Sequence, residues 1–140
     1  MEIRFTIDGS PVGKSRPRFT KGGRAYTPNK TRNYEEQVAI AADKAMKGIK
    51  YNDAPVTAFM IAYMEIPKSY SDARRQRCMK GEHMPTRPDV DNIIKAALDG
   101  CNGIVYKDDR FVYDVRCIRR YDDGKGPRLD VTFMWDSAPE

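Results

Sequence analysis

The chain has 140 residues, of which 40% are hydrophobic and 32% are charged, and it carries a formal net charge of +5. This length favours one domain, spanning residues 1–140, with a core large enough to fold unaided. The longest apolar run, over residues 56–64, is too short to cross a bilayer, and the N-terminus lacks the layout of a signal peptide. We therefore expect a cytoplasmic protein that has no membrane partner.

The first third of the chain predicts a strand, a basic loop and a helix. Hydrophobic and polar residues alternate over residues 2–8, which is typical of a strand. A basic loop over residues 9–33 follows, with a small hairpin over residues 19–26 that turns at two glycines. Between Gly13 and Asn33 there are seven basic residues and no acid, a pattern typical of a surface that meets a polyanion. A helix is then predicted from about residue 29 to residue 48.

The remaining segments complete an α+β pattern. We predict a central strand over residues 56–66, a short basic helix capped by Ser71, and a helix from residue 90 or 91 to residue 102. Two final strands, over residues 111–118 and 129–135, are predicted to form a hairpin, and residues 137–140 are expected to fray. The order β-α-β-α-α-β-β indicates one α+β domain, a small mixed sheet with helices packed on it.

The metal-binding side chains restrict which cofactor this chain can hold. Three scattered cysteines without C-x-x-C spacing and a single histidine, His83, supply too few ligands for an ordinary zinc site. If a metal is bound, carboxylates bind it, and hard oxygen ligands select Mg²⁺, with Mn²⁺ as a possible substitute.

The segment over residues 87–109 carries the strongest chemical signal. Pro88 favours a helix start just after it, so Asp89 lies at the edge of the helix and Asp91 in its first turn. Lys95 follows Asp91 by four residues and lies on the same face. Two carboxylates and a lysine thus gather at a helix N-terminus, whose unpaired N–H groups suit a phosphate.

A lone D-x-D pattern is better explained by an ordinary structural role than by a catalytic or metal-binding site. Aspartate commonly caps helices and pairs with lysine on solvated faces. The Asp108-Asp109 pair changes this balance, since it lies in a loop just before an apolar strand. If that loop folds back onto the start of the preceding helix, a three-carboxylate site results. A carboxylate cluster inside a basic protein indicates metal-assisted phosphodiester hydrolysis, with Lys95 as an electrostatic stabiliser.

The pattern D-V-D-N-x-x-K over residues 89–95, followed by Y-K-D-D over residues 106–109, resembles the RusA family of Holliday-junction resolvases. The G-K-x-R-P-R segment over residues 13–18 is similar to the phage-type branch of that family. The resemblance implies a Mg²⁺-dependent, homodimeric endodeoxyribonuclease of bacteria and their prophages, with branched DNA as substrate.

Carried onto this sequence, the resemblance implies metal binding by Asp89, Asp91 and Asp109, with Lys95 as the essential lysine. Asp108 and Asp99 are then supporting acids. The predicted DNA-binding residues are Lys14, Arg16, Arg18, Lys21, Arg24 and Arg87. Two alternatives stay open at this point. One is a non-catalytic nucleic-acid-binding protein, and the other is a D-x-D metal-dependent phosphotransferase, which the absence of a Gly-rich phosphate loop disfavours.

Overall fold

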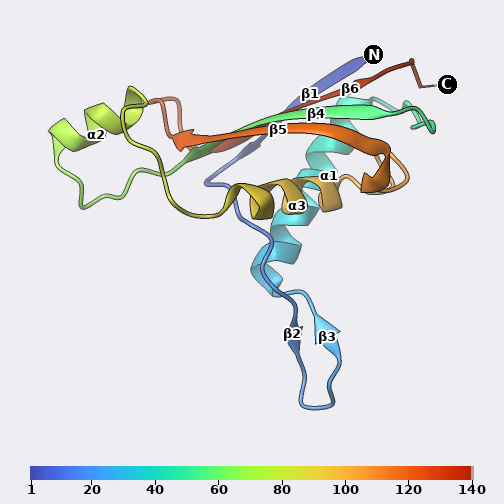
Figure 1. Cartoon of the computed structure of the whole chain (residues 1–140), viewed down its shortest axis with the longest axis horizontal. Helices are drawn as coiled ribbons and strands as arrows, with labels where there is room; N and C mark the ends of the chain where they lie inside the picture. The colour runs from blue at the N-terminus through green and yellow to red at the C-terminus, as the bar shows by residue number, and fades with distance from the viewer. Residues whose placement is uncertain (140) are drawn as a thin grey trace.

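The computed structural model describes residues 1–139, so that only Glu140, the end of the segment expected to fray, lies outside the described residues. A four-stranded sheet forms the body of the molecule, and helices α1 and α3 cover one of its faces (Figure 1). This arrangement confirms the predicted α+β class and mixed sheet. The elements in chain order are β1 Glu2–Asp8, β2 Arg18–Phe19, β3 Ala25–Tyr26, α1 Asn29–Met46, β4 Val56–Met64, α2 Asp72–Met79, α3 Val90–Gly100, the 3-10 turn η1 Asp109–Phe111, β5 Val112–Tyr121 and β6 Arg128–Trp135.

The strands follow the spatial order β1-β6-β4-β5. Strand β6 is antiparallel to both β1 and β4, whereas β4 and β5 are parallel. The predicted hairpin between the last two strands is therefore wrong, because β4 lies between β5 and β6. Alternation identified both strands, but it carries no information about which strand pairs with which. Strand β4 takes the central place because five of its nine side chains are buried.

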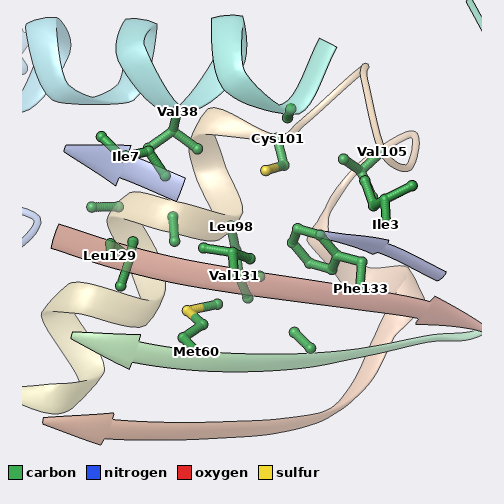
Figure 2. Close-up of a cluster of buried hydrophobic side chains, with 14 of the residues drawn as sticks. Ile3, Ile7, Val38, Met60, Leu98, Cys101, Val105, Leu129, Val131 and Phe133 are labelled. Atoms are coloured by element: carbon green, nitrogen blue, oxygen red, sulfur yellow. The ribbon is translucent and has the colours of Figure 1, made fainter. Parts of the chain in front are cut away.

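The core lies between the sheet and the two long helices. Figure 2 shows Val38 of α1 and Leu98 of α3 facing Met60, Val131 and Phe133 of the sheet. Helix α3 begins directly after Pro88 and buries an apolar stripe of Ile93, Ala96, Ala97 and Leu98, as the helical spacing predicts.

Gly100 sets the distance between α1 and α3. A Cβ at Gly100 would meet the Cβ of Val38 at 2.8 Å and the carbonyl oxygen of Glu35 at 3.0 Å. Gly100 is the last residue of α3, and its role there is close packing. The absence of a side chain lets the two helices touch, which fixes the position of α3 and of the acids at its start.

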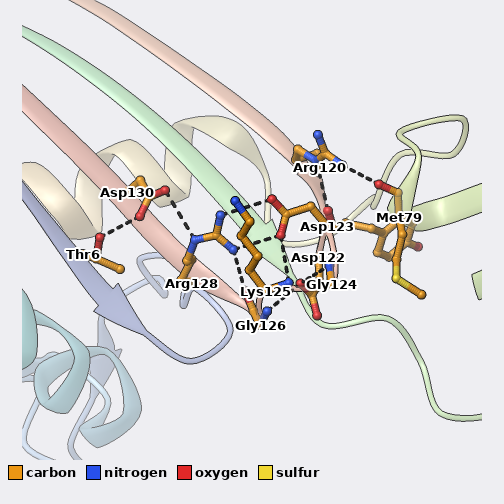
Figure 3. A network of polar contacts seen from close by, with 11 residues as sticks. Thr6, Met79, Arg120, Asp122, Asp123, Gly124, Lys125, Gly126, Arg128 and Asp130 are labelled. Atoms are coloured by element: carbon orange, nitrogen blue, oxygen red, sulfur yellow. Dashed lines mark hydrogen bonds and ion pairs between the residues drawn. The ribbon is translucent and has the colours of Figure 1, made fainter. Parts of the chain in front are cut away.

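The turn between β5 and β6 holds the second acidic pair of the chain (Figure 3). Asp122 accepts hydrogen bonds from the backbone N–H groups of Gly124 and Gly126, each at 2.9 Å. Asp123 accepts two bonds from the Arg128 guanidinium, at 3.1 and 3.2 Å, and this pairing lowers the pKa of Asp123 to about 2. Both carboxylates are therefore engaged in the structure of the turn itself.

The structure also describes the apolar character of the helices and the state of the cysteines. Within residues 1–139, no helix combines the length and the apolar character that crossing a membrane requires. The three cysteines carry free thiols, with Cys78 and Cys101 buried and Cys117 half-buried. Burial raises the pKa of Cys117 to about 11 and that of Cys101 further, so both thiols are protonated and unreactive at neutral pH.

Candidate active site and nucleic-acid interface

A cavity of about 1240 Å³ opens at the start of α3. Asp89, Asp91 and Lys95 line it from the helix, so the structure brings together three of the four predicted catalytic residues. The opposite wall comes from the basic loop. Of the predicted DNA-binding residues, Lys14, Arg16 and Arg87 lie in this lining, and Lys30 joins them although its charge alone had not distinguished it from the rest of the run.

The two helix-start acids have no ordinary structural role here. Asp89 occupies the N-cap position of α3, but its side chain makes no capping hydrogen bond. Within residues 1–139, no ion pair involves Asp91 or Lys95, although their spacing permits one. All three side chains are exposed to the cavity. Asp89 and Asp91 thus leave their carboxylate oxygens open to the cavity, and such oxygens are the ligands that a divalent cation prefers.

The basic loop is docked against the start of α3 by close backbone contacts. A Cβ at Gly13 would meet the Cβ of Pro88 at 2.7 Å, so only glycine fits there without a shift. The N–H of Lys14 donates to the carbonyl of Asn92 at 2.8 Å. From the other side, Arg119 of β5 donates to the carbonyl of Pro88 at 2.9 Å. The acid-bearing segment is thus held between the loop and the end of β5, and Arg119 is a positioning residue that sequence reasoning missed.

Lys14, one of the predicted DNA-binding residues, is already paired with acids of the same chain. Its ammonium donates to Glu35 of α1 and lies 3.2 Å from Asp99 of α3. Burial alone would lower the pKa of Lys14, but the hydrogen bonds and charges of Glu35 and Asp99 outweigh this and raise it. Lys14 therefore ties the basic loop to both helices. Asp99, expected to be a supporting acid, acts as one of its two partners.

The Lys14 ion pairs predict an alkaline loss of stability. Because the folded-state pKa of Lys14 is raised, its contribution is complete below the unfolded pKa of about 10.4 and is lost as the pH rises through the folded value. At pH 8, Lys14→Gln should lower the free energy of unfolding by about 1 kcal/mol, and this difference from the unchanged protein should disappear at an alkaline pH above the raised pKa of Lys14. Urea unfolding of both proteins, at pH 8 and at the alkaline pH, measures this difference in the free energy of unfolding. Lys44→Gln, at an exposed position of α1, serves as control, and a difference that is equal at both pH values would contradict the assignment.

The hairpin formed by β2 and β3 projects from the body of the molecule (Figure 1). Phe19 is 69% exposed and Tyr26 is 46% exposed, which is unusual for aromatic residues. Arg18, Lys21 and Arg24 are also exposed on this arm. The hairpin thus carries basic and aromatic side chains away from the sheet and toward solvent.

Asp109 lies at the opposite end of the domain from the cavity. It begins η1, directly before β5, whereas Arg119 near the end of β5 contacts Pro88. Seven residues of strand separate Val112 from Arg119, which amounts to about 23 Å. The expectation that this loop folds back onto the start of α3 is therefore wrong for a single chain. The loop is instead held at the other end of α3, where Tyr106 donates to the carbonyl of Leu98 at 2.7 Å.

The two neighbouring acids at this end differ in their contacts. Asp108 caps η1 by accepting a hydrogen bond from the N–H of Arg110 at 3.0 Å, and it lies 3.5 Å from the Arg110 side chain. Asp109 is exposed and forms no ion pair within the described part of the chain. Asp108 is thus engaged in local structure, whereas the Asp109 carboxylate is open to solvent.

Comparison with known proteins identifies the family. The family model described as Endodeoxyribonuclease RusA matches residues 8–134, which is most of the chain. The chain belongs to the RusA family. A further relative, the uncharacterized protein YqaN of Bacillus subtilis (strain 168), is 33% identical over 142 residues, covering 97% of this chain and 98% of its own length. Membership in the RusA family implies endodeoxyribonuclease activity on Holliday junctions.

The acids do not form a metal site of the RusA type within one chain. Among residues 1–139, no group of three or more Asp, Glu, His or Cys side chains is arranged to hold a metal ion. Asp89 and Asp91 supply the oxygen ligands that Mg²⁺ prefers, but two carboxylates leave the predicted set incomplete. Asp109, the third carboxylate that the resemblance predicts, is too far away in the same chain to complete it.

Proposed function

We propose that this protein is a Mg²⁺-dependent, structure-selective endodeoxyribonuclease that resolves four-way DNA junctions by paired symmetric nicks during recombination and repair. One observation carries the proposal: the Asp89 and Asp91 carboxylates, which make no structural contact that explains them, open into a cavity lined by basic residues. Such a surface attracts a phosphate backbone while keeping acidic ligands at the point where the backbone passes.

The position of Asp109 leads to the second part of the proposal, namely that each active site is built from two subunits. Strand β5 pairs with β4 along one side, and no other described strand pairs with its second side. A ten-residue free edge is a ready surface for pairing with a second copy. Around a two-fold axis such pairing is antiparallel, so the start of one β5 lies beside the end of the other.

One register of this pairing is complementary in charge. With Val115 on the two-fold axis, Asp114 lies opposite Arg116 of the partner subunit, and the same contact occurs twice. In this register Asp109 of the partner subunit lies opposite Tyr121, close to the strand end that Arg119 anchors to Pro88. The third carboxylate then reaches the cavity that holds Asp89 and Asp91. Two equal sites on a two-fold axis suit the symmetric arms of a four-way junction.

The residues of the composite site have separate tasks. Asp89 and Asp91, with Asp109 of the partner subunit, would hold Mg²⁺, which activates water and stabilises the leaving oxygen when bound. Lys95 places its ammonium beside the scissile phosphate and stabilises the charge that develops there. Arg16, Lys30 and Arg87 line the same cavity and neutralise neighbouring phosphates. Arg18, Lys21 and Arg24 on the projecting hairpin contact DNA further from the cut.

The alternatives explain fewer of these features. A non-catalytic DNA-binding protein has no use for two unpaired carboxylates inside a basic cavity, because they repel the phosphates it must bind. A D-x-D phosphotransferase usually places this motif directly after a buried strand, but here an exposed loop leads into it. Neither alternative accounts for the acid at the far end of β5.

A cleavage assay tests the proposal directly. Labelled four-way, three-way and linear duplex DNA is incubated with purified protein, with either Mg²⁺ or a chelator, and the nicks are mapped. We expect two symmetric nicks in the four-way junction in Mg²⁺, and none in chelator. Mn²⁺ is expected to replace Mg²⁺. Equal cutting of the linear duplex, or cutting in chelator, would contradict the proposal.

The basic loop predicts a strong salt dependence of junction binding. Each phosphate contact contributes close to one to the slope of log affinity against log salt, so Arg16→Gln combined with Arg18→Gln should flatten this slope by about 2. Binding is measured in chelator at several salt concentrations. Arg4→Gln, on the distant edge strand β1, is the matched control and should leave the slope unchanged. An unchanged slope in the double variant would place the DNA surface elsewhere.

A further inference from the structure

A second cavity, of about 680 Å³, adjoins the one that holds the acids. The two share four lining residues, Ser10, Met64, Glu65 and Arg87. A strand of DNA whose phosphate lies beside Asp89 and Asp91 therefore has an open path into this second space. Its size falls within the range of small-molecule sites, which is large enough for one nucleoside.

The chemistry of the second cavity differs from that of the first. Tyr70 and Tyr121 supply aromatic rings to its wall, and Pro67 and Pro85 supply further apolar surface. Polar groups are present as well, from Thr86, Lys68 and the shared Glu65. Aromatic rings stack on the faces of nucleobases, and side-chain donors and acceptors match base edges, while the Glu65 carboxylate offsets part of the positive charge of Lys68 and Arg87. The cavity thus suits a base better than a second backbone phosphate.

The aromatic wall is held in place before any ligand arrives. The guanidinium carbon of Arg74 lies 3.5 Å from the centroid of the Tyr70 ring. Tyr121 packs edge-on against the same ring, with centroids 6.4 Å apart and planes at 72°. Arg75 donates to the carbonyl of Pro67 at 2.9 Å, which fixes the loop that carries Tyr70. A rigid aromatic surface loses little freedom when a base stacks on it.

We infer that this cavity, defined by Tyr70, Tyr121 and Pro85, binds an unstacked nucleobase next to the scissile phosphate. The inference rests on the proposed function, because the strand that supplies the base is the one that passes the acids. At a branch point, bases next to the crossover are more easily unstacked than those within a duplex. The cavity therefore gives the enzyme a physical means of favouring a branch over continuous duplex, and of preferring some bases at the cut.

The test couples a change in the DNA to a change in the protein. Four-way junctions are prepared with one abasic residue at each position flanking the mapped nick, and affinity is measured in chelator. For the unchanged protein, we expect one flanking position at which base removal weakens binding about tenfold, whereas the others have little effect. Tyr70→Ala should weaken binding of the intact junction about tenfold, and base removal at that same position should then cost nothing further.

Two controls separate this inference from folding defects and from the proposed function. Tyr51→Ala removes a ring that lines a different cavity, and it should keep the full sensitivity to base removal. In the unchanged protein, 2-aminopurine at the sensitive position should change its fluorescence on binding, which requires no variant at all. If the protein cuts junctions in Mg²⁺ but no position shows coupling to Tyr70, the base site is wrong and the nuclease stands. If no junction is cut, the proposed function itself fails.

Discussion

The variant Asp91→Asn is expected to bind four-way junctions at least as tightly as the unchanged protein and to leave them uncut. Asp91 lies in the first turn of α3 and lines the acid cavity. The substitution keeps the size of the side chain but removes a negative charge that repels DNA. Cleavage in Mg²⁺ should fall by more than about a hundredfold, since substitutions of outer-shell partners alone typically cost 10- to 100-fold. Junction binding in chelator and nicking in Mg²⁺ are measured on the same preparation.

A matched control is available within the chain. Asp72 also lies in the first turn of a helix, α2, and is exposed, but it does not line the acid cavity. Asp72→Asn changes the net charge by the same amount and should leave cleavage unaffected. If Asp91→Asn retained full cleavage in Mg²⁺, the carboxylates at the start of α3 would have no part in the reaction.

Mixing two inactive variants should restore cleavage, if each site draws on two subunits. In a heterodimer of Asp91→Asn and Asp109→Asn chains, one composite site contains both substitutions and the other contains neither. About half of randomly assembled dimers are heterodimers, so roughly a quarter of the normal number of sites should be intact. Each active dimer has only one such site. The expected product is therefore a junction nicked in a single strand, and not the paired cuts of the unchanged protein.

The mixing experiment distinguishes the two possible arrangements of the site. If Asp109 joined Asp89 and Asp91 of its own chain, both sites of the heterodimer would be damaged and mixing would restore nothing. Co-expression with two different tags isolates the heterodimer and removes any dependence on subunit exchange. Each variant alone, tested at the same total concentration, gives the baseline. Lack of activity in the purified heterodimer would rule out the shared site.

Much of the fold was predictable because local patterns determine it. The apolar stripe of α3, its start after Pro88 and the alternation in β1 are all properties of neighbouring residues. The order of the strands was not predictable, because the partner of β5 depends on which strand is most deeply buried. Alternation in β5 and β6 fitted a hairpin equally well, yet the nine-residue β4 separates them.

The candidate site also has one part that neighbouring residues determine and another part that depends on the whole fold. The proximity of Asp89, Asp91 and Lys95 was predictable because all three belong to the start of one helix, and their roles in the reaction stay a prediction. The place of Asp109 was not predictable, since it depends on the length and direction of β5. The ion pairs of Lys14 were not predictable for a related reason: Glu35 and Asp99 come from two helices that are separated in sequence from it and from each other.

The separation of Asp109 from the start of α3 has a consequence for unwanted cleavage of cellular DNA. A nuclease with the proposed shared site would be harmless while each copy remains alone, such as just after synthesis. Its activity per molecule should fall on dilution as the subunits come apart, whereas an enzyme with a self-contained centre would keep its turnover. Chromosomal DNA is then exposed to the catalyst only where two copies have already met, and a crossover with two equivalent arms favours that meeting.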